Sequence, residues 1–230
     1  MLLTIYERSR DWHHALQLTR ELASDNPTHH AVRAAQYSCE IGDAARAQGQ
    51  TDAAERAYQE ALTLHPQAVR PALALAHMAH ARGEHHAALE QLLRLVHAQP
   101  QAAALAAVWL AQWAQALPEA RAKAVAALQI AQQVAPSVDV TLALAHLQPE
   151  QSNTLLDEAL TQRPALALAR ERLHSEPHTP PAVLHAIDQA MGPGQRYRCT
   201  RCGFEAQQYF WQCPGCQSWE SFPFKRCGEA

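Results

Sequence analysis

The chain has 230 residues, of which 48% are hydrophobic and 18% are charged, and its formal net charge is -3 at pH 7. This length is sufficient for one extended domain or for two compact ones. The slightly negative charge excludes a general electrostatic attraction to nucleic acid or to an anionic membrane.

Prolines recur through much of the chain at the spacing of a helical repeat. Pro66 and Pro100 are 34 residues apart, which is the tetratricopeptide period, and Pro27 and Pro136 lie 39 and 36 residues outside them. Each such repeat is a pair of helices that stacks on its neighbours. The spacing therefore predicts a mainly α-helical solenoid of tetratricopeptide repeats.

Positions inside the repeats follow the same pattern. Before Pro66, a turn glycine, two small residues and an aromatic residue are expected, and the sequence has Gly49, Ala54, Ala61 and Tyr58 there. Small residues let paired helices approach closely, and the aromatic ring fills the gap between repeats. The corresponding positions of the other repeats hold Trp12, Ala15, Gly83, Ala88, Leu92, Leu95, Ala124, Leu128 and Ala131.

The repeat shortens after Pro136. Pro164 follows after only 28 residues, and short helices are expected from Val138 to Leu147 and from about Glu150 to Gln162. We interpret this region as a degenerate repeat. The first repeat is expected to be truncated, with its leading helix cut short by Met1.

A helix over residues 165–174 and a break at SEPHTPP come next. A further helix is expected from about Pro181 to Met191, with Thr179 as its candidate cap and Gly192 as its end. The linker that follows is short, which favours a terminal module that is docked on the repeats.

Two Cys-x2-Cys pairs near the end of the chain are the most specific motif. Cys199 and Cys202 form the first pair, Cys213 and Cys216 form the second, and ten residues separate the pairs. Four thiolates at this spacing can reach one ion at about 2.3 Å, which predicts a closed metal site. Because so short a segment buries little core, ligation must supply on the order of 10 kcal/mol of folding free energy. Zinc is the default metal, and iron in a rubredoxin-like centre is the alternative.

Neighbouring residues suit such a module. Gly203 directly follows the first pair, where the backbone tends to need a positive φ, and Pro214 and Gly215 are expected to act similarly inside the second. The aromatic residues are dense here, and we expect them to form a miniature core and a docking face. They are Tyr197, Phe204, Tyr209, Phe210, Trp211, Trp219, Phe222 and Phe224.

The basic residues of the module allow two interpretations. A divalent ion with four thiolates has a formal charge of about -2, which nearby cations would balance. The alternative is a surface for nucleic acid or lipid headgroups. We favour the first interpretation for Arg196, Arg198, Arg201, Lys225 and Arg226.

The other cysteines and histidines give no second site. We expect Cys39 to be buried as a small hydrophobic residue and Cys227 to be a free thiol. These two cysteines are a poor disulfide framework, which favours a reducing, cytosolic setting. His77 and His80 are three residues apart, but no carboxylate or cysteine nearby completes a metal site. The histidines are therefore expected at the surface.

Signals for catalysis and membrane insertion are absent from the sequence. It contains no phosphate-binding glycine loop, nucleophile elbow or His-Glu-x2-His motif. The most apolar run, residues 102–117, is interrupted by Gln112 and Gln115 and is too short to span a bilayer, and no signal peptide opens the chain. We predict a soluble binding protein and no enzyme.

These patterns divide the chain into three parts. We expect a repeat array over residues 1–175, a capping helix and linker over residues 176–194, and a rubredoxin-like, zinc-ribbon metal module over residues 195–226. Leading helices line the concave surface of such arrays, so residues near Tyr37 and Trp109 are candidates for partner contact, as are those near Ile41 and Leu75.

With repeats and cysteines placed, the chain resembles the lipopolysaccharide assembly protein B family. Its members combine an amino-terminal membrane helix, which we do not find here, with tetratricopeptide repeats and a terminal rubredoxin-like domain. The stretches IYERSRDWHHAL and AQYSCEIGDAA are similar to the family's repeats. The module carries the most specific part of the resemblance, at Tyr197, Arg198, Cys199, Cys202, Gly203, Phe204, Trp211, Cys213, Pro214, Cys216 and Trp219.

The resemblance implies a non-enzymatic adaptor at the cytoplasmic face of the inner membrane. Family members act with a membrane-anchored ATP-dependent protease that degrades the committed-step deacetylase of lipid A synthesis, and they are linked to lipopolysaccharide assembly. The implied partners are therefore that protease, lipid A pathway enzymes or lipopolysaccharide transport components. The resemblance also makes the four module cysteines metal ligands. The alternatives are a nucleic-acid-binding zinc ribbon and electron transfer by an iron site.

Overall fold

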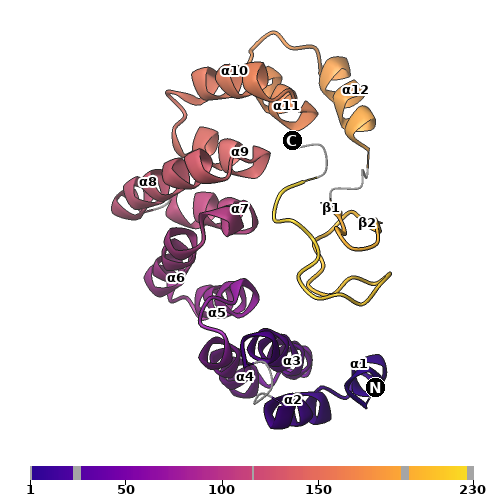
Figure 1. Cartoon of the computed structure of the whole chain (residues 1–230). Coiled ribbons are helices and arrows are strands. Elements are labelled where there is room, and N and C mark those ends of the chain that lie inside the picture. The colour runs from indigo at the N-terminus through magenta and orange to yellow at the C-terminus, as the bar shows by residue number, and fades with distance from the viewer. Residues whose placement is uncertain (1, 23–26, 116, 193–196, 227–230) are drawn as a thin grey trace. The chain divides into compact units, whose positions relative to one another are not determined.

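The computed structural model describes residues 2–22, 27–115, 117–192 and 197–226. In these ranges, twelve α-helices precede two short strands (Figure 1). The chain forms two compact units, Met1–Leu92 and Leu93–Ala230. The fold is mainly helical and tetratricopeptide-like, with a small four-cysteine module at its end, as the sequence predicts.

Helix pairs build the first unit. Its helices, the last of which continues into the second unit, are α1 (Leu2–Ser9), α2 (Trp12–Glu21), α3 (Pro27–Ala47), α4 (Thr51–Leu64), α5 (Val69–Ala81) and α6 (His85–Ala98). The turn after α3 contains Gly49 at φ +74°, and the turn after α5 contains Gly83 at φ +82°. These values lie in the left-handed region, where a side chain costs about 1 kcal/mol. Both predicted turn glycines are confirmed.

Tyr58 is at the centre of the core of this unit. Its side chain is fully buried among small residues that include Ala54, Ala61 and Cys39, so the predicted burial of Cys39 is confirmed. Gly42 on α3 lies so close that a Cβ there would be 2.7 Å from Cε1 of the Tyr58 ring. The small residues of the repeat therefore make room for one aromatic ring.

A buried arginine links α5 to α3. Arg70 is 6% exposed, and its guanidinium donates to Gln36 Oε1 at 3.2 Å, Glu40 Oε1 at 2.7 Å and Asp43 Oδ2 at 2.6 Å. Burial alone would lower the pKa of Arg70, but Glu40 and Asp43 outweigh burial and raise that pKa. The cation is thus held in the interior by hydrogen-bonded carboxylates.

Tyr37, near which partner contacts are expected, is itself buried and so does not offer its own side chain to a partner. The side chain is fully buried and stacks on Trp12, with ring centroids 5.8 Å apart. Its hydroxyl donates to Glu7 Oε1 at 2.6 Å and accepts from Arg33 Nε at 3.1 Å. Tyr37 therefore fastens α1 and α2 to α3.

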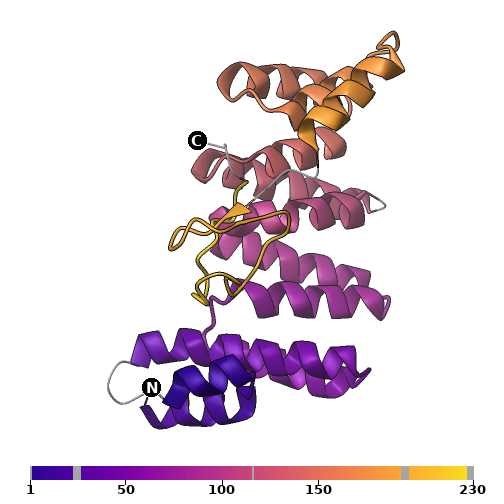
Figure 2. The same cartoon turned by 90° about the vertical axis from the view of Figure 1, so that its right-hand side faces the viewer.

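The second unit continues the pairing of helices. Figures 1 and 2 show α7 to α10 stacked in chain order. None of the helices in the described ranges is both long enough and apolar enough to cross a membrane. After the short 3-10 helix η2 (Pro100–Ala102), the unit contains α7 (Ala103–Ala114), α8 (Pro118–Val134), α9 (Val138–Leu147), α10 (Ser152–Gln162), α11 (Leu166–His174) and α12 (Pro181–Met191).

The helices expected after Pro136 are all present, but the start of α10 and the cap of α12 differ from the expectation. Helix α10 begins at Ser152, two residues later than expected. The residue before α12 is Pro180, which makes no side-chain cap, so the expected cap at Thr179 is wrong. Pro181 instead starts the helix, because its fixed φ suits a first turn whose N–H groups have no helical partners.

Candidate metal centre

A short hairpin forms the first cysteine knuckle. Strands β1 (Tyr197–Arg198) and β2 (Glu205–Ala206) pair antiparallel. Between them, the Cys199 N–H donates to Phe204 O at 2.8 Å and the Gly203 N–H donates to Cys199 O at 2.9 Å. Gly203 has φ +78°, so the positive φ expected at this residue is confirmed. The turn holds Cys199 and Cys202 on one side of the hairpin end.

The second knuckle has the same hydrogen-bond pattern but a different glycine requirement. The Gln217 N–H donates to Cys213 O at 2.8 Å, and the Cys213 N–H donates to Ser218 O at 2.9 Å. Gly215 does not have a positive φ, so the conformational role expected for it is wrong. A Cβ at Gly215 would lie 3.3 Å from the Phe204 side chain and 3.4 Å from Cys202 Sγ. Glycine suits this position because the two knuckles pack closely and a larger residue would require Phe204 to shift.

The knuckles bring all four predicted cysteines together. Their Sγ atoms lie within 4.8 Å of one another, with Cys199 and Cys216 at 3.8 Å and Cys202 and Cys213 at 3.6 Å. Tetrahedral ligation with metal–sulfur bonds of about 2.3 Å places the sulfurs about 3.8 Å apart. The cluster is therefore consistent with one bound ion, and its donor set suits zinc and iron alike.

Burial and hydrogen bonding distinguish the thiols. Cys199 and Cys213 are buried, whereas Cys202 and Cys216 are exposed. Burial opposes ionisation of Cys199, but its hydrogen bond with Ser221 and one from the Arg201 N–H lower its pKa to about 6. Burial raises the pKa of Cys213 to about 12. A bound divalent ion would favour the thiolate form of every ligand.

Tyr209 organises the aromatic core of the module. Its ring meets those of Tyr197, Trp211 and Phe222 edge to face and stacks on Phe224. Its hydroxyl donates to Phe222 O at 3.1 Å, and burial raises its pKa. These contacts bear out the expected miniature core, although Phe204 lies outside it and is 38% exposed.

Two of the module's predicted cations are paired with carboxylates. Arg198 Nε donates to Glu205 Oε1 at 2.8 Å across the hairpin. Arg226 Nε donates to Asp139 Oδ2 at 2.9 Å, and a second guanidinium nitrogen donates to Oδ1 of the same residue. Asp139 is 6% exposed and belongs to the first turn of α9, so this pair joins the module to a helix 87 residues earlier. Arg196 and Cys227 lie outside the described residues.

The histidines do not add a second centre in the part of the chain that the structure describes. His80 Nδ1 and His85 Nδ1 are 3.1 Å apart, but no third ligand joins them. The four cysteines are the one group of three or more His, Cys, Asp or Glu there that is placed to share an ion.

Paired helices and the cysteine cluster define the class as a tetratricopeptide-like protein with a terminal rubredoxin-like domain. The family model described as "Rubredoxin metal binding domain", a zinc ribbon of lipopolysaccharide assembly protein B, matches residues 197–223.

The chain as a whole is a distant homologue of the lipopolysaccharide assembly protein B family. It is 24% identical to the Haemophilus influenzae protein of that name and 22% identical to the Escherichia coli K12 protein, over 96% of this chain in each case. The alignments cover 59% and 60% of the two relatives, so the chain spans about three fifths of their length.

The crystal structure of a tetratricopeptide repeat protein from Parabacteroides merdae aligns with a TM-score of 0.46 and 18% identity, over 75% of this chain and 68% of that one.

Proposed function

We propose that this chain is a non-enzymatic adaptor in lipopolysaccharide assembly. The observation that carries the proposal is its 24% identity, over 96% of its length, to a protein named lipopolysaccharide assembly protein B. More specifically, we propose that it promotes degradation of the committed-step lipid A deacetylase by a membrane-anchored ATP-dependent protease. It would act at the cytoplasmic face of the inner membrane.

The mechanism is proximity. An adaptor that binds client and protease together raises their effective concentration, so degradation accelerates without chemistry by the adaptor itself. Stacked helix pairs offer an extended surface for one partner. A second contact on the terminal module would supply the other.

The cysteine cluster gives this second contact its shape. One ion would be held by all four cysteines of the module, Cys199, Cys202, Cys213 and Cys216, and would cross-link the two knuckles. Four protein ligands fill a tetrahedral shell and leave no position for a substrate, so we assign the ion a structural role. The Arg226–Asp139 pair then ties the module to α9.

A reconstituted degradation assay tests this function. The half-life of the deacetylase is measured with the protease alone and after addition of this protein. We expect the intact protein to shorten the half-life severalfold and the Cys213→Ser/Cys216→Ser variant to lose that effect. The matched control is Cys39→Ala, which changes a cysteine outside the module. An unchanged half-life with the intact protein would refute the adaptor function.

Nucleic-acid binding is the weaker candidate. Two of the module's cations, Arg198 and Arg226, are paired with Glu205 and Asp139, which reduces the positive charge that phosphates would meet. Affinity for a labelled oligonucleotide that falls steeply with salt would support it instead.

A further inference from the structure

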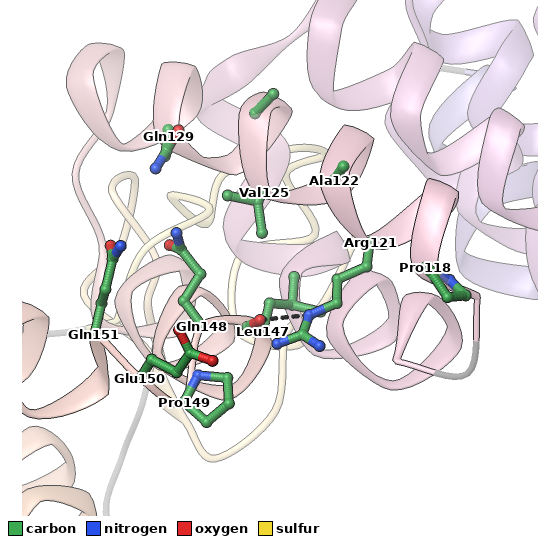
Figure 3. A pocket seen from close by; sticks show the side chains of 11 residues that line it. Pro118, Arg121, Ala122, Val125, Gln129, Leu147, Gln148, Pro149, Glu150 and Gln151 are labelled. Atoms are coloured by element: carbon green, nitrogen blue, oxygen red, sulfur yellow. Dashed lines mark hydrogen bonds between the residues drawn. The ribbon is translucent and has the colours of Figure 1, made fainter.

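A groove lies between α8 and the turn that joins α9 to α10 (Figure 3). Its volume is about 450 Å³, within the range of about 300–1,000 Å³ for ligand sites. From α8, Arg121, Ala122, Val125 and Ala126 line one wall at helical spacing. Gln148 and Glu150 belong to the facing wall.

Along α8, small apolar side chains form the floor of the groove. Ala122 and Ala126 are exposed, and Val125 between them is half-buried. Because these side chains are short, the groove stays open along the helix. The stretch from Arg121 to Ala126 rises by about 8 Å, which two or three residues of an extended peptide would cover.

One end of the groove presents a cation in a fixed position. Arg121 Nε donates to Leu147 O at 2.6 Å, which anchors the guanidinium against the turn (Figure 3). Its two terminal nitrogens have no protein partner among the residues that the structure describes. A guanidinium held in this way is prepared to donate two parallel hydrogen bonds to a carboxylate.

The facing wall presents acceptors. Gln148 Oε1 is buried and has no hydrogen-bond partner in the described chain. An unsatisfied buried acceptor costs about 1–3 kcal/mol, and a ligand N–H would recover this cost once the half-buried Gln148 side chain turns its oxygen into the groove. The Glu150 carboxylate on the same turn is a second acceptor. The groove thus combines one donor group with two acceptors around an apolar floor.

We propose that this groove binds a short, extended acidic segment of a protein partner. Its carboxylate would pair with Arg121, a backbone N–H would donate to Gln148 Oε1, and a small aliphatic side chain would lie on Ala122 and Ala126. A peptide suits the groove because it carries an acid, regularly spaced N–H groups and small apolar side chains together. The inference rests on the proposed adaptor function and names the surface that one partner would use.

Fluorescence polarisation with labelled hexapeptides tests the proposal on the full-length, metal-loaded protein. The probe is Gly-Ala-Val-Asp-Ala-Gly, and it is compared with the same peptide carrying Asn or Lys in place of Asp. We expect the acidic peptide to bind about tenfold more tightly than the Asn peptide, and its affinity to fall with salt. No binding at about 1 mM, or equal affinity for the three peptides, would overturn the proposal.

Two variants locate the binding. Ala126→Trp fills the groove from an exposed position and Arg121→Gln removes the cation, so each is expected to weaken binding by about tenfold or more. Ile130→Trp is the matched control, since Ile130 is 50% exposed on the same helix and does not line the groove. Circular dichroism verifies that each variant is folded. Unchanged binding by Ala126→Trp would contradict the assignment.

The outcome is separable from that of the degradation assay. Failure of peptide binding while this protein still shortens the deacetylase half-life would reject the groove and keep the adaptor function. Peptide binding at the groove without any effect on the half-life would reject the adaptor function and keep the groove as a peptide-binding site.

Discussion

Gly42 shows how a single hydrogen side chain determines the packing of two helices. The α3 backbone at this residue touches the ring of Tyr58, whose hydroxyl donates to Asp43 Oδ1 at 2.5 Å. The ring is fully buried and is held by the α4 backbone at one end and by the hydrogen bond to Asp43 at the other, so it has little freedom to move away from Gly42.

We expect Gly42→Ala to destabilise the protein by about 1–2 kcal/mol. Alanine is favoured over glycine in a helix by about 1 kcal/mol, but overpacking a rigid site costs about 1–3 kcal/mol and should outweigh that gain. Urea unfolding measures the difference. The exposed Ala44→Gly is the control, because it reports helix propensity without the contact. A more stable Gly42→Ala protein would show that the ring can shift.

Helix α12 is joined to α11 by an exposed ion pair in addition to half-buried apolar residues. None of its residues is buried, and Asp188 accepts from Arg170 Nε of α11 at 2.5 Å and from a second guanidinium nitrogen at 3.3 Å. The hydrogen bond with Arg170 lowers the pKa of Asp188 below 3.8. An acid with a lowered pKa contributes stability above its unfolded value and loses it as the pH falls through the folded value.

We therefore expect the contact between α12 and α11 to weaken as the pH falls below about 3.8, before the buried helices unfold. Backbone chemical shifts of residues 181–191 along an acid titration measure this, with α9 as the internal reference. The Asp188→Asn variant should already show, at pH 7, the α12 chemical shifts that the wild-type protein shows only in acid. Equal acid sensitivity in wild-type and Asp188→Asn proteins would rule out this carboxylate as the cause.

The start of α9 is the element to which the metal module is attached. Ser137 caps this helix by accepting from the Val140 N–H at 3.2 Å, and Asp139 in its first turn receives Arg226. Arg226→Gln would leave the Asp139 carboxylate buried without its cation, at a cost of about 1–3 kcal/mol.

The Arg226→Gln variant should keep its metal, since Arg226 is not among the four clustered thiols. We expect one ion per chain by elemental analysis together with faster hydrogen exchange in the first turn of α9. Arg201→Gln, at an exposed residue of the module, is the control and should leave α9 unchanged. Slow exchange retained in Arg226→Gln would refute the attachment.

At the scale of the whole molecule, the module and the helices are stabilised differently, because they bury different amounts of apolar surface. The buried core of the module consists of Cys199, Ala206, Cys213 and Phe222, whereas each helix pair buries its own apolar face. A core this small needs ligation to stay folded.

We expect chelation to unfold residues 197–224 while most of the helical circular dichroism at 222 nm persists. Hydrogen exchange of the module's backbone amides measures this unfolding, and added zinc should restore their protection from exchange. Metal uptake should also weaken in acid, because protons compete with the ion for the thiolates. Loss of the helical signal in parallel with the metal would mean that the whole chain depends on the ion.

Much of the fold and most of the candidate site could be predicted because their signals are local. Turn glycines such as Gly49 and Gly203 are required by a backbone conformation that only a few neighbouring residues determine. The two-residue gap between paired cysteines similarly reflects the reach of a single turn. Helix pairs recur at a spacing close to the tetratricopeptide period as far as Pro136, so their order can be read along that part of the chain.

What only the tertiary structure decided are the contacts between residues far apart in sequence. The Arg226–Asp139 pair, the burial of Tyr37 and the crowding of Gly215 by Phe204 depend on which surfaces meet after folding. The groove is of the same kind, because Arg121 and Gln148 become neighbours only when α8 packs beside α9. The sequence by itself determined the helices, their turns and the metal motif, since short-range backbone geometry encodes them. Packing determined which charges are paired and which polar groups remain available for a partner.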